Sequence, residues 1–160
     1  MHRSIGVLLL FVWLQGCGAD TRAPHQVHVQ FSDTSGLTVT DDSGKSQQLI
    51  AESLDARAVV APSGQWIAVE DMRMSNLVVV RLFRYQHGTY AEIALPEIRQ
   101  HWEALARESG IAFEDLLRPR VAIESFDPAE KTLLLRFQAD TDDDREIDSM
   151  LEIALAEKSE

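Results

Sequence analysis

The sequence predicts a mainly β protein, with antiparallel blade-like hairpins, a sheet and one amphipathic helix packed on it, which is α+β by a strict count. Most of the chain alternates apolar and polar residues, the period-two pattern of strands with one buried face. Clusters of proline, glycine and aspartate separate these segments, as turns require. One stretch, 96–109, instead repeats its apolar residues at helical spacing.

Three strands are expected at the start of the globular part. Residues 27–31 and 37–40 both alternate apolar with polar side chains. The sequence Asp-Asp-Ser-Gly at 41–44 is typical of a turn. A third strand through 49–50 is therefore expected to return as a hairpin.

The central block predicts a longer set of strands. Residues 57–61 and 66–70 flank Pro-Ser-Gly-Gln at 62–65, which predicts a tight hairpin. Residues 76–85 form the longest strand candidate and are apolar on both faces, so both faces need cover. Arg81 and Arg84 interrupt this run as charges that oppose aggregation. A turn at 86–88 then leads to a returning strand at 89–95.

One helix is expected between Pro96, an accepted first-turn residue, and Gly110, a typical helix stop. Its apolar stripe contains Ile98, Trp102, Leu105 and Ala106. We expect this stripe to cover one face of the sheet that contains 76–85. A second, short helical turn is expected at 113–117, before Pro119.

The last third predicts strands at 120–126 and 132–139 around a turn at 127–130. An acidic run at 140–148 follows, and residues 150–155 then favour a final strand. A helix is the competing interpretation there, because Ile147, Leu151 and Leu155 also have i, i+4 spacing.

Two blocks resemble the repeat unit of a known fold family. The segments 61–69 and 76–80 (Ala-Pro-Ser-Gly-Gln-Trp-Ile-Ala-Val, then Asn-Leu-Val-Val-Val) are similar to the blade unit of WD-type and Tol-system periplasmic β-propellers. Residues 126–155 look like a degenerate second copy. The resemblance implies blade-like antiparallel sheet. A closed propeller needs four to eight four-stranded blades, which is more than this chain can supply, so no propeller activity is implied.

The N-terminal segment has the features of an export signal. His2 and Arg3 give a positive start, and residues 5–14 are apolar except for Gly6. An apolar run of about ten residues is roughly half of the ~20 that a membrane-spanning helix needs. The run ends in Leu-Gln-Gly-Cys at 14–17, which contains the only cysteine of the chain.

This segment resembles the signal peptide and lipobox of bacterial lipoproteins. The resemblance implies that a signal peptide, 1–16, is removed, that Cys17 carries the lipid, and that 17–26 is a lipidated tether. Residues 27–160 then form a single β-rich domain. Glycine in place of aspartate at position 18 implies the outer membrane, with the domain facing the periplasm, in preference to the inner membrane. The expected partners are the membrane, through lipid on Cys17, and an envelope protein.

The charge of the chain limits its partners. Fifteen basic residues against 26 acidic residues give a formal charge of −11, and loss of Arg3 with residues 1–16 would make it −12. Such a surface repels phosphate backbones, so no nucleic-acid partner is expected. Solubility is the simpler explanation of the charge.

The acidic run at 140–148 matches a calcium-binding loop only in part. Asp140, Asp142 and Asp144 occupy positions one, three and five of such a loop. Position six is Arg145 where an EF-hand has glycine, and position twelve is Leu151 where it has glutamate. The run therefore predicts a solvated loop, and no metal ligands or cofactor-binding residues are predicted.

No catalytic residues are predicted either. The sequence has no phosphate-binding glycine loop and no nucleophile elbow. Glu97 and His101 could form an acid/base pair on one helix face, but a surface contact is the commoner reason for that spacing. Trp66 and Trp102 could line a ligand site, and core packing is the commoner role.

Two hypotheses about function remain. The first is an outer-membrane-anchored lipoprotein whose domain binds or scaffolds within the cell envelope without catalysis. The alternative is a small-molecule or ion-binding envelope protein, with the possibility of an enzyme of unrecognised type. A broad exposed apolar patch would favour the first, and a deep pocket with convergent polar groups would favour the second.

Overall fold

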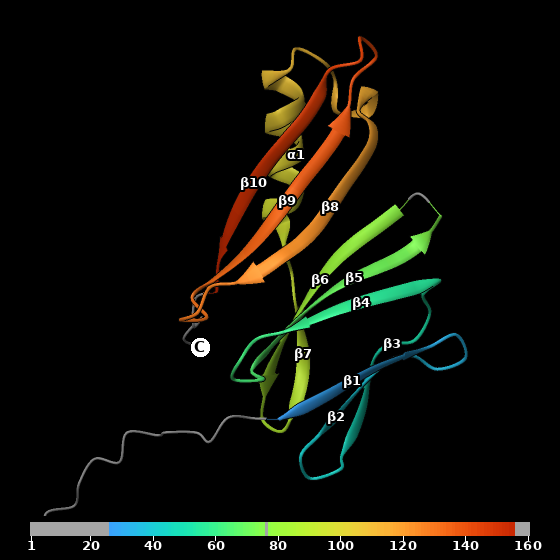
Figure 1. Ribbon diagram of the computed structural model, residues 1–160, viewed down its shortest axis with the longest axis vertical. Helices are drawn as coiled ribbons and strands as arrows, with labels where there is room; N and C mark the ends of the chain where they lie inside the picture. Colours follow the sequence, from blue (N-terminus) through green and yellow to red (C-terminus); the bar gives the residue numbers. More distant parts are fainter. Residues whose placement is uncertain (1–25, 76, 156–160) are drawn as a thin grey trace, which may run out of the picture.

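The computed structural model describes residues 26–75 and 77–155, and within them the protein is mainly β with a single α-helix, as predicted. Its strands form three consecutive antiparallel meanders, in which each strand pairs with its neighbour in sequence (Figure 1). The expected signal peptide, Cys17 and most of the tether lie outside the described residues.

The first sheet contains β1 (Val27–Ser32), β2 (Gly36–Asp41) and β3 (Ser46–Ile50), in that order. All three strands were predicted. Gly36 begins β2 with a φ of 64°, and a Cβ atom there would lie 2.0 Å from the carbonyl oxygen of Ile50. The close approach of β3 therefore requires glycine at this position.

The middle sheet contains β4 (Asp55–Val60), β5 (Trp66–Met74), β6 (Leu77–Gln86) and β7 (Thr89–Ile93), again in sequence order. Its strands alternate between two apolar clusters, so from Val80 onward β6 is covered on both faces as predicted, whereas Leu77 and Val79 at its start remain exposed. On one face, Ile67, Val69, Phe83 and Tyr90 pack with the first sheet. On the other face, Trp66, Ala68, Val80 and Leu82 join the larger cluster formed with the third sheet and the helix.

The third sheet contains β8 (Leu117–Phe126), β9 (Thr132–Asp140) and β10 (Glu146–Ala154), with β9 in the centre. The strand interpretation of the last segment is confirmed, and the helical alternative is wrong. Leu133, Leu135 and Phe137 share the buried face of β9 and are fully enclosed. Pro119 lies within β8, where it is tolerated because β8 is an edge strand with an irregular register at this point.

The helix α1 (Pro96–Glu108) begins and ends close to the predicted residues, and a 3-10 turn, η1 (Phe113–Asp115), follows it. The expectation that it covers the sheet containing 76–85 needs correction. Trp102 packs edge-on against Phe137 of β9, with 4.9 Å between ring centroids, and α1 contacts β10. The apolar face of the third sheet is thus shared between α1 and the middle sheet, because it is long enough to cover both (Figure 1).

Four hairpin turns share one geometry. In each, the backbone N–H of the fourth residue donates to the carbonyl of the first, and the fourth residue has a positive φ. The fourth residues are Gly44, Gly64, Glu130 and Asp144. Glycine adopts this conformation without strain, whereas Glu130 and Asp144 adopt it at a cost of about 1 kcal/mol each.

Candidate functional site

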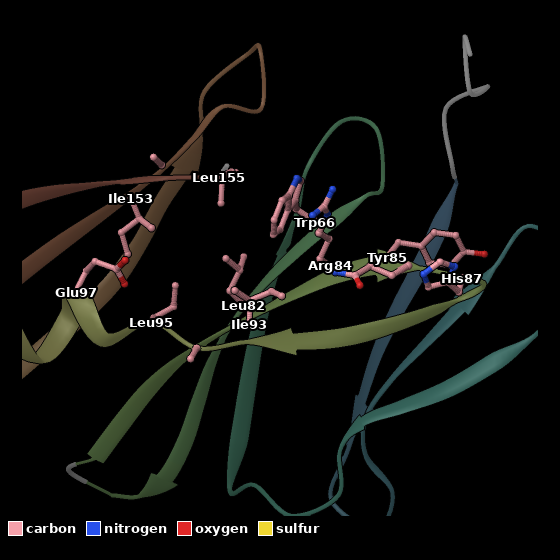
Figure 2. A pocket seen from close by; sticks show the side chains of 13 residues that line it. Trp66, Leu82, Arg84, Tyr85, His87, Ile93, Leu95, Glu97, Ile153 and Leu155 are labelled. Atoms are coloured by element: carbon pink, nitrogen blue, oxygen red, sulfur yellow. The ribbon is translucent and has the colours of Figure 1, made fainter. Parts of the chain in front are cut away.

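A cleft of about 580 Å³ opens where the middle sheet meets the start of α1 and the end of β10. Most of its wall is apolar. Figure 2 shows Leu95 and Glu97 at one end of this cleft, Trp66 and Arg84 near the middle, and Tyr85 and His87 at the other end. We call it the Trp66 cleft; its apolar side chains include Trp66, Leu82, Ile93, Leu95, Ile153 and Leu155.

Arg84 supplies a positive charge to the wall of the Trp66 cleft. Its guanidinium lies over the indole of Trp66, 5.3 Å from the ring centroid, which is within the range of a cation–π contact. Within the described part of the chain, no carboxylate forms an ion pair with Arg84. Arg84 is therefore a cation without an ion-pair partner among these residues, beside apolar side chains, and Glu97 lies at one end of the cleft, away from it. The part of the cleft around Arg84 suits a ligand with an anionic group.

The structure separates Glu97 from His101, the pair considered for acid/base chemistry. Glu97 lines the Trp66 cleft. The Nε2 atom of His101 instead lies 3.1 Å from the hydroxyl of Ser149 on β10, and its ring packs edge-on against Phe137. In the described residues no hydrogen bond joins Glu97 to His101.

The contact between His101 and Ser149 joins α1 to the third sheet. Partial burial lowers the pKa of His101, and the charge of Glu108 acts in the opposite direction. The neutral imidazole is thus favoured at this interface. Neither His101 nor Ser149 lines the Trp66 cleft, so their hydrogen bond serves packing.

Three carboxylates of the acidic run are engaged by arginines. Asp140 pairs with Arg118 at 2.9 Å, and Asp148 pairs with Arg136 at 2.5 Å. Asp143 accepts hydrogen bonds from Thr141 and Arg145 inside the turn between β9 and β10, and the Thr141 bond is the first cause of its lowered pKa. Within residues 26–75 and 77–155, no group of three or more metal-ligating side chains could hold an ion.

Exposed apolar side chains gather at the end of the middle sheet where the hairpin of β5 and β6 turns. Leu77 on β6 is 44% exposed, Val79 39%, Met74 on β5 59%, and Leu54, just before β4, 63%. Leu54 belongs to the same end of the sheet because its backbone N–H donates to the carbonyl of Met72. We call these four residues the apolar end.

The sequence predicts some properties of the apolar end, the two tryptophans and Arg84, but not where these residues lie relative to one another. The strand 76–85 was predicted with Leu77 and Val79 on one face, but its periodicity could not show that the first sheet stops short of them. Trp66 and Trp102 are 7% exposed and belong to the core, as the packing interpretation predicts, although Trp66 also lines the cleft. The sequence predicts Arg84 only as a charge that opposes aggregation, and its spacing gives no signal for its position over Trp66.

No helix among the described residues is long and apolar enough to cross a membrane.

Comparisons of this chain with family models, with curated proteins and with solved structures find no match.

Proposed function

We propose that this protein is an outer-membrane-anchored lipoprotein whose β domain acts by contact, as a non-enzymatic binding or scaffolding domain in the cell envelope. The N-terminal sequence that ends at Cys17 supports the anchor. In this proposal, lipid on Cys17 holds the domain close to the membrane. The short tether raises its effective concentration for neighbouring envelope proteins.

The apolar end carries the contact part of the proposal. Four large apolar side chains that gather at one end of a sheet expose surface that water disfavours, and such patches mark interaction sites. Burial of this surface against a partner would stabilise a complex by about 25 cal/mol for each Å² of apolar area removed from water, before the costs of association. The apolar end therefore favours a protein partner.

The anchor is tested by replacing Cys17 with serine. Wild-type precursor should be cleaved and should incorporate radioactive palmitate, because a modified lipoprotein cysteine carries two or three acyl chains, enough for stable attachment. The Cys17→Ser precursor should remain uncleaved and unlabelled. Equal labelling of the two versions would overturn the lipid anchor.

The contact is tested by photo-crosslinking in intact cells from position 79, within the apolar end. Position 152 on β10 is the matched control, because Glu152 is also an exposed strand residue. We expect a discrete adduct from position 79 and none from position 152. The yield should fall when a cleavable soluble signal replaces the anchor. Failure to form an adduct from position 79 in anchored protein would contradict the proposal.

A second candidate function, binding of a small amphipathic molecule, is favoured by the Trp66 cleft. Arg84 without a carboxylate partner, beside six apolar side chains, suits a carboxylate on a hydrocarbon tail. Decanoate is a suitable probe, and decanol is its uncharged control. If this function is correct, decanoate should raise the melting temperature more than decanol does, and Arg84→Gln should abolish the difference. No such difference in the wild-type protein would exclude this ligand class.

A further inference from the structure

The first half of β6 forms an open edge of the middle sheet. β7 pairs with β6 only along Leu82–Gln86, and the chain leaves the sheet after Ile93 toward α1. Residues 77–81 of β6 pair with β5 on one side. On their other side, the described part of the chain provides no paired strand.

The hydrogen-bond pattern fixes which backbone groups face this open edge. Tyr85 donates its N–H to the carbonyl of Gln65, 2.8 Å away, so every second residue of β6 from Tyr85 bonds to β5. The intervening residues direct both backbone groups to the other side, where Leu82 lies opposite Ile93. Val80 and Val78 continue this series beyond the end of β7. Their outward N–H and C=O groups have no hydrogen-bond partner among the described residues.

A second cleft, of about 550 Å³, runs along the open edge. Val78 and Val80 belong to the face of the middle sheet that packs with the third sheet, and on that side the cleft is apolar. Ile98 and Trp102 of α1 and Val121 of β8 complete this wall. A side chain directed to this face would therefore enter an apolar pocket.

The opposite wall of this second cleft is mostly polar, with Val79 as its apolar member. Arg81 bonds both carboxylate oxygens of Glu92, at 2.8 and 2.5 Å. The Oδ2 atom of Asp71 is ion-paired with Arg73, at 3.2 Å, and with Arg81, at 3.5 Å. The Asp71 side chain is fully buried, and its Oδ1 atom has no hydrogen-bond partner among the residues that the structure describes. A buried acceptor without a partner is costly, so this wall favours a side chain that donates a hydrogen bond.

We propose that an envelope protein partner binds here by strand addition, with an extended segment pairing antiparallel to residues 77–81 of β6 in line with β7. The segment alternates apolar residues, which face α1 and β8, with hydrogen-bond donors such as threonine, which face Asp71 and Glu92. Main-chain hydrogen bonds to Val78 and Val80 supply affinity. Because one wall of the second cleft is apolar and the other is mostly polar, only one alignment of the alternating segment with β6 places each side chain on the matching wall. This proposal rests on the proposed contact function, and it specifies strand addition as the way in which the partner binds.

Overall charge favours a basic segment. The chain carries a formal charge of −11, which attracts cationic partners at long range and raises their association rate. Lysines that flank the paired residues would lie outside the second cleft, away from Arg81. The partner segment is therefore a short alternating strand with basic flanks.

The test uses the full-length protein in detergent and a fluorescent peptide of seven alternating valine and threonine residues with lysine at each end. We expect saturable binding by fluorescence anisotropy. Binding should be weaker for the same peptide with glutamate at each end. A third peptide with proline at its centre should not bind. Equal binding of the proline peptide would overturn strand addition.

Hydrogen exchange locates the peptide on the protein. Saturating peptide should slow exchange of the Val78 and Val80 amides, which face the open edge. The Val79 amide faces β5 and should be unaffected, so it serves as an internal control. Protection elsewhere, with none at Val78 and Val80, would overturn the proposal.

Val78→Pro removes an outward N–H and leaves the hydrogen bonds to β5 intact, as proline at a sheet edge allows. Val78→Thr is the matched control, because it keeps the N–H and the β-branched shape. We expect Val78→Pro to weaken peptide binding about tenfold or more, and Val78→Thr to bind like wild type. Circular dichroism and thermal melts of both variants check the fold, and equal peptide affinity of the two folded variants would contradict strand addition.

The same variants separate the two proposals in cells. Loss of the adduct from position 79 in Val78→Pro, but not in Val78→Thr, supports strand addition. An adduct that persists in both variants overturns strand addition and leaves the contact function standing. If sedimentation shows that the chain self-associates through this edge, the occupant is a second copy, and the partner-strand proposal is wrong.

Discussion

At the scale of the residue, burial decides the state of His101. Its ring packs edge-on against Phe137 while its Nε2 lies 3.1 Å from the Ser149 hydroxyl, so the apolar surroundings favour the neutral imidazole and lower the pKa. A histidine at i, i+4 from a glutamate is a common surface pair. Here the tertiary packing turns it toward the third sheet instead.

This lowered pKa predicts that stability falls on mild acidification. As the pH falls through the ordinary histidine value of 6.5, the unfolded chain takes up a proton before the folded one does, so the free energy of unfolding decreases. In His101→Gln this contribution is absent. We expect urea unfolding at pH 7.5 and 5.5 to show a smaller loss in the variant than in the wild type.

Between pH 7.5 and 5.5, the change in stability reports on His101 and not on a carboxylate such as Asp127. Backbone hydrogen bonds, first that of Thr132, lower the pKa of Asp127 below its ordinary 3.8, so its contribution to stability is lost only as the pH falls below that value. An equal loss of stability in wild type and His101→Gln between pH 7.5 and 5.5 would show that burial does not favour the neutral form.

At the scale of the element, α1 is held by its apolar stripe. Trp102 is 7% exposed and packs against Phe137, and Leu105 and Ala106 are also buried. Across the helix, Arg99 pairs with Glu103 in solvent, at 2.8 Å. An exposed i, i+4 pair of this kind contributes little, so the buried face determines how firmly the helix is attached.

Replacing Trp102 with alanine should therefore reduce the free energy of unfolding by about 3 to 5 kcal/mol, because a large buried ring is lost and a cavity remains. Arg99→Ala is the matched control on the exposed face and should change it by no more than about 0.5 kcal/mol. Urea titrations of the three proteins give both values. A loss below about 1 kcal/mol for Trp102→Ala would mean that the helix is peripheral to the fold.

At the scale of the whole molecule, the turn between β8 and β9 links the third sheet to the middle sheet. Glu130 in this turn accepts hydrogen bonds from the backbone N–H of Ser63, at 2.5 Å, and from the Ser63 hydroxyl. Ser63 lies in the turn between β4 and β5. The φ of Glu130 is 54°, a backbone conformation that favours glycine. The residue is nevertheless a glutamate, and its side chain makes the contact with Ser63.

Substitution with glycine separates the strain at Glu130 from its contact. Asp144 occupies the equivalent position of the turn between β9 and β10, and Asp144→Gly should be neutral or stabilise the protein by up to about 1 kcal/mol. Glu130→Gly relieves the same strain but removes the bonds to Ser63, so we expect a net loss of about 1 to 2 kcal/mol. Equal effects on the urea midpoint would show that the Glu130–Ser63 contact does not hold the sheets together.

The sequence by itself determined most of the secondary structure. Alternation of apolar and polar residues located the strands, Pro-Ser-Gly-Gln at 62–65 located a tight hairpin, and Pro96 and Gly110 located the helix. These signals are local, because side-chain periodicity and turn conformation depend on neighbours in the chain. The two apolar faces of β6 also predicted cover on both sides, which is correct for its second half, whereas Leu77 and Val79 in the first half are exposed.

Only the tertiary structure decided how these elements meet. The third sheet divides its apolar face between α1 and the middle sheet, Arg84 lies over Trp66, and β7 ends early enough to leave Val78 and Val80 on an open edge. Each of these depends on which surfaces pack together and where a neighbouring strand stops. Residues distant in sequence make those contacts, and no local pattern specifies them.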